Sequence, residues 1–488
     1  MEAVVRHRLA TKDTLGMKRS DLGLALSAIL VFGAVDRVDG ASWDERVFAT
    51  HVDFDAVTKQ GESAIPALIE RGRILFKAKF TTEDGAGRPK ATQAIVPTKR
   101  KRGANPAFSR TSGPDSNACS GCHNDPIAGG SGDFVADVFV SEGFESPQFD
   151  NTDPTFSSER HTTPLMGSGL VELLAREMTA DLQEIRNGAV KQSRASGVDV
   201  RADLVSKGVR FGSILAHPDG IVDLASIEGV DADLIVRPFS RKGVFTSLRQ
   251  FSINAMNIHH GMEAMERFGV RWTGTHDFAE SGVPDAVTPG DISALVAFQA
   301  NLAPPTVKQD LPEDWRTAAA EGAKQFTTLG CASCHISALP LKSLTFTDPA
   351  PYDMAGTLRE SESQNSIRID LSKAAFAARL QKNDKGEWLI PLFSDLKRHL
   401  MVDAAVNALG NELQAQRFVE RDVFLTPRLW GVASTAPYGH RGDFRSLDEI
   451  IRAHGGEARF ARDAYLDSDK SMRDDVIAFL RTLEIKAP

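Results

Sequence analysis

Two copies of the motif C-x-x-C-H contain all four cysteines of the chain. The copies consist of Cys119, Cys122 and His123, and of Cys331, Cys334 and His335. This spacing is the covalent attachment signature of c-type haem. Two thiols about one helical turn apart can form thioethers with both vinyl groups, and the adjacent histidine can bind the iron as its proximal ligand. The sequence therefore predicts two covalently bound haem c groups and redox chemistry.

Zinc binding and dithiol redox chemistry are the alternative interpretations of these cysteines. C-x-x-C alone occurs in thioredoxin-like pairs and as half of a four-cysteine zinc site. Neither alternative accounts for a histidine directly after both pairs. A zinc site would also have to join motifs that lie more than 200 residues apart. No cysteine remains for a disulfide framework, so the motifs favour haem.

The N-terminus resembles a secretory signal peptide. The uncharged apolar run Leu22–Val35 follows two basic residues and precedes a small-residue cleavage site that ends at Gly40. The run is shorter than the ~20 residues of a membrane-spanning helix. We therefore expect residues 1–40 to be removed on export to the periplasm, which leaves no stable membrane span. A retained N-terminal anchor is the alternative, and Met17 is an alternative start.

Composition narrows the class of protein. The chain has 488 residues, of which 42% are hydrophobic and 25% charged, as in globular proteins of two or three domains. Its net charge of −8 argues against nucleic-acid binding. One basic run, residues 99–102, is interpreted as a solvated loop, with a docking site for an electron-transfer partner as the alternative.

A similar helical stretch precedes each haem motif. Gly72 is followed four residues later by Phe76, and Gly322 by Phe326, so each pair lies on one helix face. The final stretch, residues 472–483, has a matching apolar stripe. The arrangement resembles cytochrome c domains, in which the helix before the haem motif crosses the C-terminal helix and its glycine allows close approach. This resemblance implies that the glycine-bearing helix of the second unit crosses the last helix closely.

The expected fold class is mainly α, with two cytochrome c-like haem domains. The N-terminal haem domain is expected over residues 41–304 and the C-terminal one over residues 305–488. Short alternating segments around turns predict a small β insertion at residues 205–240 of the first domain. Helices are expected at residues 245–268 and 290–302.

Beyond the haem motifs, several further segments resemble the di-haem cytochrome c peroxidase superfamily. The chain is most similar to large di-haem oxidoreductases described as peroxidase-like or thiol oxidoreductase-like. The segments that carry this resemblance are residues 85–89, 119–126, 164–172, 395–401, 426–431, 438–442 and 454–458. Together they span the chain from about residue 70 to its end.

The resemblance implies two unlike haems. The C-terminal haem would be six-coordinate and receive electrons, and the N-terminal haem would activate an oxidant. Met401, in the segment similar to D-L-x-x-H-D-M, is then the candidate sixth ligand of the His335 haem, and His399 competes with it. A methionine ligand raises the reduction potential, as an electron-entry haem requires.

The other side of the His123 haem is less defined. His260 is the candidate distal ligand or distal-pocket residue, and His161, His259 and Met166 compete with it. The position could instead be open and bind peroxide. Cleavage of peroxide requires a proton relay. By position in the motifs, the carboxylate candidates for that relay are Glu172 and Glu263, for which a structural or solvent-exposed role is the alternative.

Two departures from the family pattern qualify this resemblance. Related peroxidases place a tryptophan between the haems, but this chain has no tryptophan between Trp43 and Trp272. Trp430 or a phenylalanine would have to serve as the bridge. Relatives that oxidise tryptophans of a partner protein have a tyrosine ligand where this chain has Met401, which argues against that activity. The family often binds calcium between its domains, so calcium is a possible further cofactor.

The sequence thus predicts a periplasmic di-haem c oxidoreductase. A small donor protein, such as a cytochrome c or cupredoxin, or a quinol-linked donor would supply electrons at the C-terminal haem. A small oxidant, hydrogen peroxide first among candidates, would be reduced at the N-terminal haem. The alternatives are a non-enzymatic di-haem electron carrier or redox sensor, and an oxidase of thiols or an organic substrate.

Overall fold

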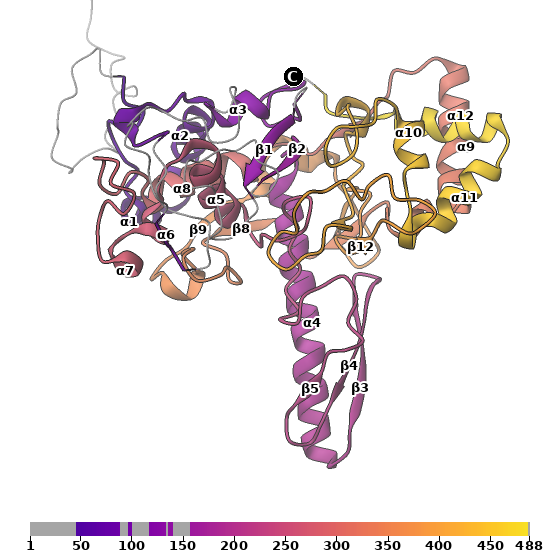
Figure 1. Cartoon of the computed structure of the whole chain (residues 1–488), viewed down its shortest axis with the longest axis horizontal. Helices are drawn as coiled ribbons and strands as arrows, with labels where there is room; N and C mark the ends of the chain where they lie inside the picture. Colours follow the sequence, from indigo (N-terminus) through magenta and orange to yellow (C-terminus); the bar gives the residue numbers. More distant parts are fainter. Residues whose placement is uncertain (1–44, 88–95, 100–116, 133–134, 140–156, 487–488) are drawn as a thin grey trace, which may run out of the picture. The chain divides into compact units, whose positions relative to one another are not determined.

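A computed structural model describes residues 45–87, 96–99, 117–132, 135–139 and 157–486 (Figure 1). The expected signal peptide and three residues of the basic run, 100–102, lie outside this part of the chain. The described residues from 45 onward belong to one compact unit. Within the described part, helices are combined with six antiparallel sheets of two or three strands. The architecture is therefore mixed α and β, so the expectation of a mainly α chain holds only in part.

The helix that precedes the first haem motif crosses a helix from later in the chain. Helix α2 (Ile65–Lys77) crosses α8 (Pro289–Ala300), one of the helices expected from the sequence. The two backbones touch, because a Cβ atom added to Gly72 would lie 1.8 Å from the carbonyl oxygen of Ala294. Only glycine allows the two helices to come this close.

The second haem motif has an equivalent crossing. Helix α9 (Glu313–Thr328) lies across α12 (Lys470–Leu480), as Figure 1 shows. A Cβ atom on Gly322 would lie 1.9 Å from the carbonyl oxygen of Asp475. The predicted close crossing of the glycine-bearing helix and the last helix is confirmed.

The phenylalanine one turn after each glycine packs next to the motif histidine. The ring centroids of Phe76 and His123 are 6.1 Å apart, and those of Phe326 and His335 are 6.2 Å apart. The same Gly–Phe spacing therefore builds the same local arrangement twice: the glycine permits the helix crossing, and the phenylalanine supports the histidine.

The predicted β insertion is present and begins slightly earlier than expected. Strands β3 (Val200–Ser206), β4 (Val209–Ala216) and β5 (Val222–Asp223) form an antiparallel sheet in that order. This sheet lies along the second half of the long helix α4 (Ser168–Ser196) (Figure 1). The alternation of buried and exposed residues in β4 matches a sheet with one face packed against a helix.

The remaining elements are short. The helices are α1 (Phe54–Gln60), α3 (Cys119–Cys122), α5 (Leu248–His260), α6 (Met265–Phe268), α7 (Val270–Thr273), α10 (Leu447–Arg452) and α11 (Arg459–Asp467). The strands are β1 (Val135–Phe139), β2 (Ser157–His161), β6 (Thr306–Val307), β7 (Leu339–Leu341), β8 (Thr345–Asp348), β9 (Ile367–Asp370), β10 (Gln381–Lys382), β11 (Trp388–Ile390), β12 (Arg398–Leu400), β13 (Val423–Leu425) and β14 (Leu483–Glu484).

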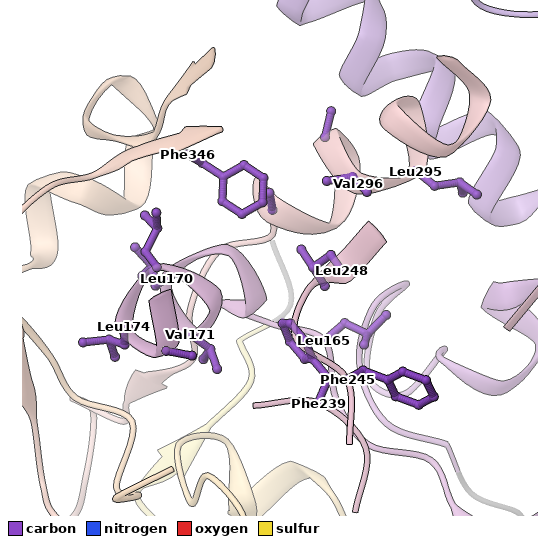
Figure 2. Packing of buried hydrophobic residues seen from close by; sticks show 14 of the residues in the cluster. Leu165, Leu170, Val171, Leu174, Phe239, Phe245, Leu248, Leu295, Val296 and Phe346 are labelled. Atoms are coloured by element: carbon purple, nitrogen blue, oxygen red, sulfur yellow. The ribbon is translucent and has the colours of Figure 1, made fainter. Parts of the chain in front are cut away.

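Two hydrophobic clusters form the core. The larger cluster includes Leu174, Leu248 and Phe346, and Trp430 is its last buried member along the chain. Figure 2 shows part of this cluster. The smaller contains the contact of α9 with α12 and neighbouring C-terminal residues. The larger cluster includes residues from both sides of the predicted boundary at 304/305. The segments before and after the boundary therefore share one core. The boundary itself stays a prediction.

Candidate functional site

Both C-x-x-C-H motifs line one continuous cavity of about 400 Å³. The cavity wall includes every cysteine and histidine of the two motifs. All four cysteines are free thiols and half-buried. Cysteines from segments far apart in the sequence therefore line one shared space, as two prosthetic groups attached at the two motifs would require.

The first motif forms the short helix α3 beside α2. His123, which follows it, is supported by Phe76, whose ring also packs 5.1 Å from Phe298 of α8. Desolvation lowers the pKa of His123 to about 4. The imidazole is therefore neutral at neutral pH, which is the form that binds a metal ion.

The second motif presents its histidine in an orientation suited to iron. The Nδ1 atom of His335 donates a hydrogen bond to the carbonyl oxygen of Phe393 over 3.1 Å. Desolvation, followed by the neighbouring His454, lowers the pKa of His335 to about 4. The neutral ring thus carries its proton on Nδ1 and its lone pair on Nε2, as metal-binding histidines with a backbone partner do. The residues of both motifs fit haem c.

The zinc alternative can be tested at one cluster. Cys334, Asp395 and His399 place possible ligand atoms within 4.8 Å of one another. However, His399 already bonds Asp395 through Nε2 over 2.8 Å and Glu457 through Nδ1 over 2.7 Å. Burial lowers the pKa of His399, but Asp395 and the Cys334 thiol outweigh it and raise that pKa to about 11. A protonated imidazole between two carboxylates is a poor ligand for zinc or for haem iron.

Met401, the candidate sixth ligand of the His335 haem, lines the cavity directly after β12. Its backbone is fixed on both sides, because its N–H donates to the carbonyl of Asp422 over 2.9 Å and its carbonyl accepts from Gly455 over 3.2 Å. The structure therefore brings the 395–401 and 454–458 segments together on the wall next to His335.

His454 is a candidate ligand that the sequence reasoning missed. Its Nδ1 donates to the carbonyl of Ile450 over 2.7 Å, so its Nε2 is left for another partner. His454 lines the cavity, and after desolvation its charge is the largest influence on the pKa of His335. Its position in the H-G-G-E-A segment was visible in the sequence, but only the fold places it beside His335.

On the other side of the cavity, His259 and His260 end helix α5, and both line the wall. His260 Nε2 lies 3.7 Å from Cys119 Sγ, and its ring meets the edge of Phe80. Burial, followed by the charges of His260 and His123, lowers the pKa of His259 to about 3. Consecutive helical side chains point about 100° apart, so the pair cannot both face one iron position.

The competing candidates on this side have other partners. His161 lines the cavity, but its Nε2 donates to the carbonyl of Gly132 over 2.7 Å and its Nδ1 faces Arg241 at 3.4 Å. Met166 is buried and is not part of the cavity wall. The structure thus favours α5 over these two residues as the source of a distal side chain.

The two carboxylates predicted for a proton relay lie away from the cavity wall. Glu172 is buried, forms an ion pair with Arg176 and accepts a hydrogen bond from the Leu248 N–H at the start of α5 over 2.8 Å. Glu263 accepts from the N–H of Ala279 over 2.9 Å. Neither residue lines the cavity. Their role in acid-base chemistry stays a prediction, and their contacts are those of structural carboxylates.

The two kinds of residue suggested as an aromatic bridge between the haems lie in different surroundings. Trp430 is buried against Gly167, where an added Cβ atom would lie 2.5 Å from its ring, and it is not in the cavity wall. Phe424 does line the cavity, stacked on His440 with 4.5 Å between ring centroids. The phenylalanine alternative is therefore better placed between the motifs than the tryptophan.

Two further findings concern the described residues. The Cys334 cluster is the one group of three or more histidine, cysteine or carboxylate ligands found close together in this part of the chain, so no calcium-type carboxylate cluster supports that expectation here. In the same part of the chain, no helix has the length and apolar character needed to cross a membrane.

The sequence matches no protein-family model and no curated protein. Among solved structures, Kuenenia stuttgartiensis hydrazine synthase is 14% identical, with 92% of this chain and 98% of that chain covered and a TM-score of 0.39. A MauG-like protein associated with microbial copper homeostasis is also 14% identical, with 65% and 90% covered and a TM-score of 0.26. Similarities this distant identify neither the fold nor the activity of this chain.

Proposed function

We propose that this protein is an exported di-haem c oxidoreductase that passes electrons from the His335 side of the cavity to the His123 side and there reduces a small oxidant, hydrogen peroxide first among candidates. The observation that carries the proposal is that all cysteines and histidines of both C-x-x-C-H motifs line one cavity. Bound haem c would supply one-electron redox chemistry and, at an open iron position, a binding site for the oxidant.

The two walls of the cavity support unequal roles. Next to His335, Met401 and His454 both line the wall, so a protein ligand is available for a sixth position. A haem iron with protein side chains at both positions outside the porphyrin would carry electrons without binding substrate. Next to His123, His259 and His260 at the end of α5 line the wall and are the candidate distal side chains. A small donor protein or quinol-linked donor would deliver electrons at the His335 side.

Purified protein from a host that matures c-type cytochromes provides the test. A pyridine haemochrome assay should give two haems per chain, and one haem in the matched variants Cys119→Ser/Cys122→Ser and Cys331→Ser/Cys334→Ser. After one-electron reduction, the His123 haem should become high-spin and react with peroxide. Stoichiometric turnover with peroxide and reduced cytochrome c should follow.

Each other result has a defined meaning. A haem count of zero contradicts the proposal as a whole. Two low-spin haems that are inert to peroxide would instead indicate an electron carrier or redox sensor. Haem reduction by thiols or an organic substrate, without peroxide turnover, would indicate an oxidase.

A further inference from the structure

Three arginines from separate segments line the cavity that holds both haem motifs. Arg160 lies in β2, Arg241 lies in a turn before α5, and Arg428 follows β13. Desolvation, followed by the charges of Arg160 and Arg428, lowers the pKa of Arg241, so Arg241 lies close enough to both other guanidinium groups to be repelled by them. We call these three residues the arginine cluster.

One carboxylate faces the arginine cluster. Glu412 is 1% exposed and forms an ion pair with Arg160, which is 8% exposed. The charge of Glu412 also acts on Arg241, where it raises the pKa of the guanidinium against the larger lowering by burial. For Arg428, desolvation is the resolved influence on its lowered pKa of about 10. Three positive charges therefore face one negative charge in a mostly buried region.

The neighbouring histidines are neutral and do not change this excess of positive charge. His161 is neutral, because burial and then Arg241 lower its pKa to about 4. His440 is 5% exposed, and burial followed by Arg160 and Arg241 lowers its pKa to about 2. Lys242, beside the cluster, donates to three backbone carbonyls, so its ammonium group is already engaged.

Several donors of the arginine cluster have no hydrogen-bond acceptor among the described residues. The Nη2 atom of Arg160 and the Nε atom of Arg241 are buried and have no such acceptor. Arg241 otherwise donates through Nη2 to the carbonyl of His161 over 3.1 Å, and Arg428 donates to the carbonyl of Pro164 over 3.0 Å. Each guanidinium has five N–H donors, so most of this capacity remains for a further acceptor.

Buried excess charge with unused donors is costly unless an anion binds to it. Arginine is suited to this role because its planar fork binds a carboxylate through two parallel hydrogen bonds. We propose that the arginine cluster is an anion site in the cavity wall that takes a carboxylate-type oxyanion. The inference rests on the proposed function in one respect: a haem propionate is the favoured source of that carboxylate, and a free small oxyanion from solvent is the other.

The test uses the full-length holoprotein and the variants Arg241→Gln and Arg241→Lys. Arg237→Gln is the matched control, because Arg237 is similarly buried, is paired with Asp231 and Asp233 and does not line the cavity. Three quantities are measured: haem per chain, the midpoint potentials of both haems, and formate binding by calorimetry.

If a propionate occupies the site, loss of a cation should favour the oxidised iron. The oxidised-to-reduced ratio of at least one haem should then rise about tenfold at a fixed ambient potential, which corresponds to ~59 mV for a one-electron couple. Arg241→Lys should recover most of this shift, and Arg237→Gln should show none. Formate should bind neither wild type nor variant.

A free oxyanion gives a different pattern. Formate would then bind the wild type and Arg237→Gln but not Arg241→Gln, and the potentials measured without formate would be unchanged. If neither the potentials nor formate binding depends on Arg241, the anion site is disproved. A protein without haem would end the proposed function, and formate binding to that same protein would still decide whether an anion site exists.

Discussion

Gly322 of α9 lies directly on the backbone of Asp475 in α12, where an added Cβ atom would be 1.9 Å from the carbonyl oxygen. We expect Gly322→Ala to force the helices apart and to lower the free energy of unfolding by about 1–3 kcal/mol, as overpacking does. Urea denaturation measures this effect. Gly188→Ala is the control, since Gly188 lies in α4 with nothing within 4 Å of an added Cβ atom, and alanine there should stabilise by up to ~1 kcal/mol. Equal effects of both substitutions would contradict the importance of the crossing.

The sixth ligand of the His335 haem can be assigned by two substitutions. His454 has its Nδ1 fixed by Ile450, and its charge influences His335, so we expect His454→Leu to convert this haem from low-spin to high-spin. Met401→Leu should leave it low-spin. Electron paramagnetic resonance and the optical spectrum of the oxidised protein report both states. The opposite pattern would assign the ligand to Met401, as the sequence resemblance implies.

Glu172 should matter for stability more than for chemistry. It bonds Arg176 and the start of α5 and does not line the cavity. Glu172→Gln removes the charge that pairs with a partly buried arginine, so we expect a loss of about 1.5–3 kcal/mol, the range for hydrogen bonds to charged groups. Peroxide turnover per folded molecule should be unchanged. A large loss of turnover with an unchanged melting temperature would instead restore the acid-base role predicted from the sequence.

His399 should make stability depend on pH. Before haem is attached, Asp395 and the Cys334 thiol outweigh burial and raise its pKa to about 11 from an ordinary value of 6.5, so the folded haem-free protein holds a proton that the unfolded state releases. This contribution is fully present below about pH 6.5 and is lost as pH rises toward 11. Denaturation midpoints measured across this range should fall with pH in the haem-free wild type. The fall should be shallower in His399→Gln, and identical slopes would show that His399 titrates normally.

The local features of the fold could be predicted from the sequence because each depends on a few neighbouring residues. C-x-x-C-H predicts a haem attachment site from five residues, whatever the fold around it. The Gly72–Phe76 and Gly322–Phe326 spacings predict helix crossings, because helical periodicity alone puts each pair on one face. The β insertion and helix α8 were likewise visible as local periodicity and turn residues.

The sequence by itself determined which residues form the two C-x-x-C-H motifs and predicts their chemistry, whereas the tertiary structure decided which distant residues lie beside them. His454 gained significance only because its segment packs beside Met401 and near His335. Glu172 is a proton-relay candidate by its position in a motif, but the fold places it in an ion pair with Arg176. The arginine cluster comes from three segments separated by loops, and its excess charge exists only where the chain buries those side chains together. Covalent attachment is encoded locally, but burial and electrostatic balance depend on the whole fold.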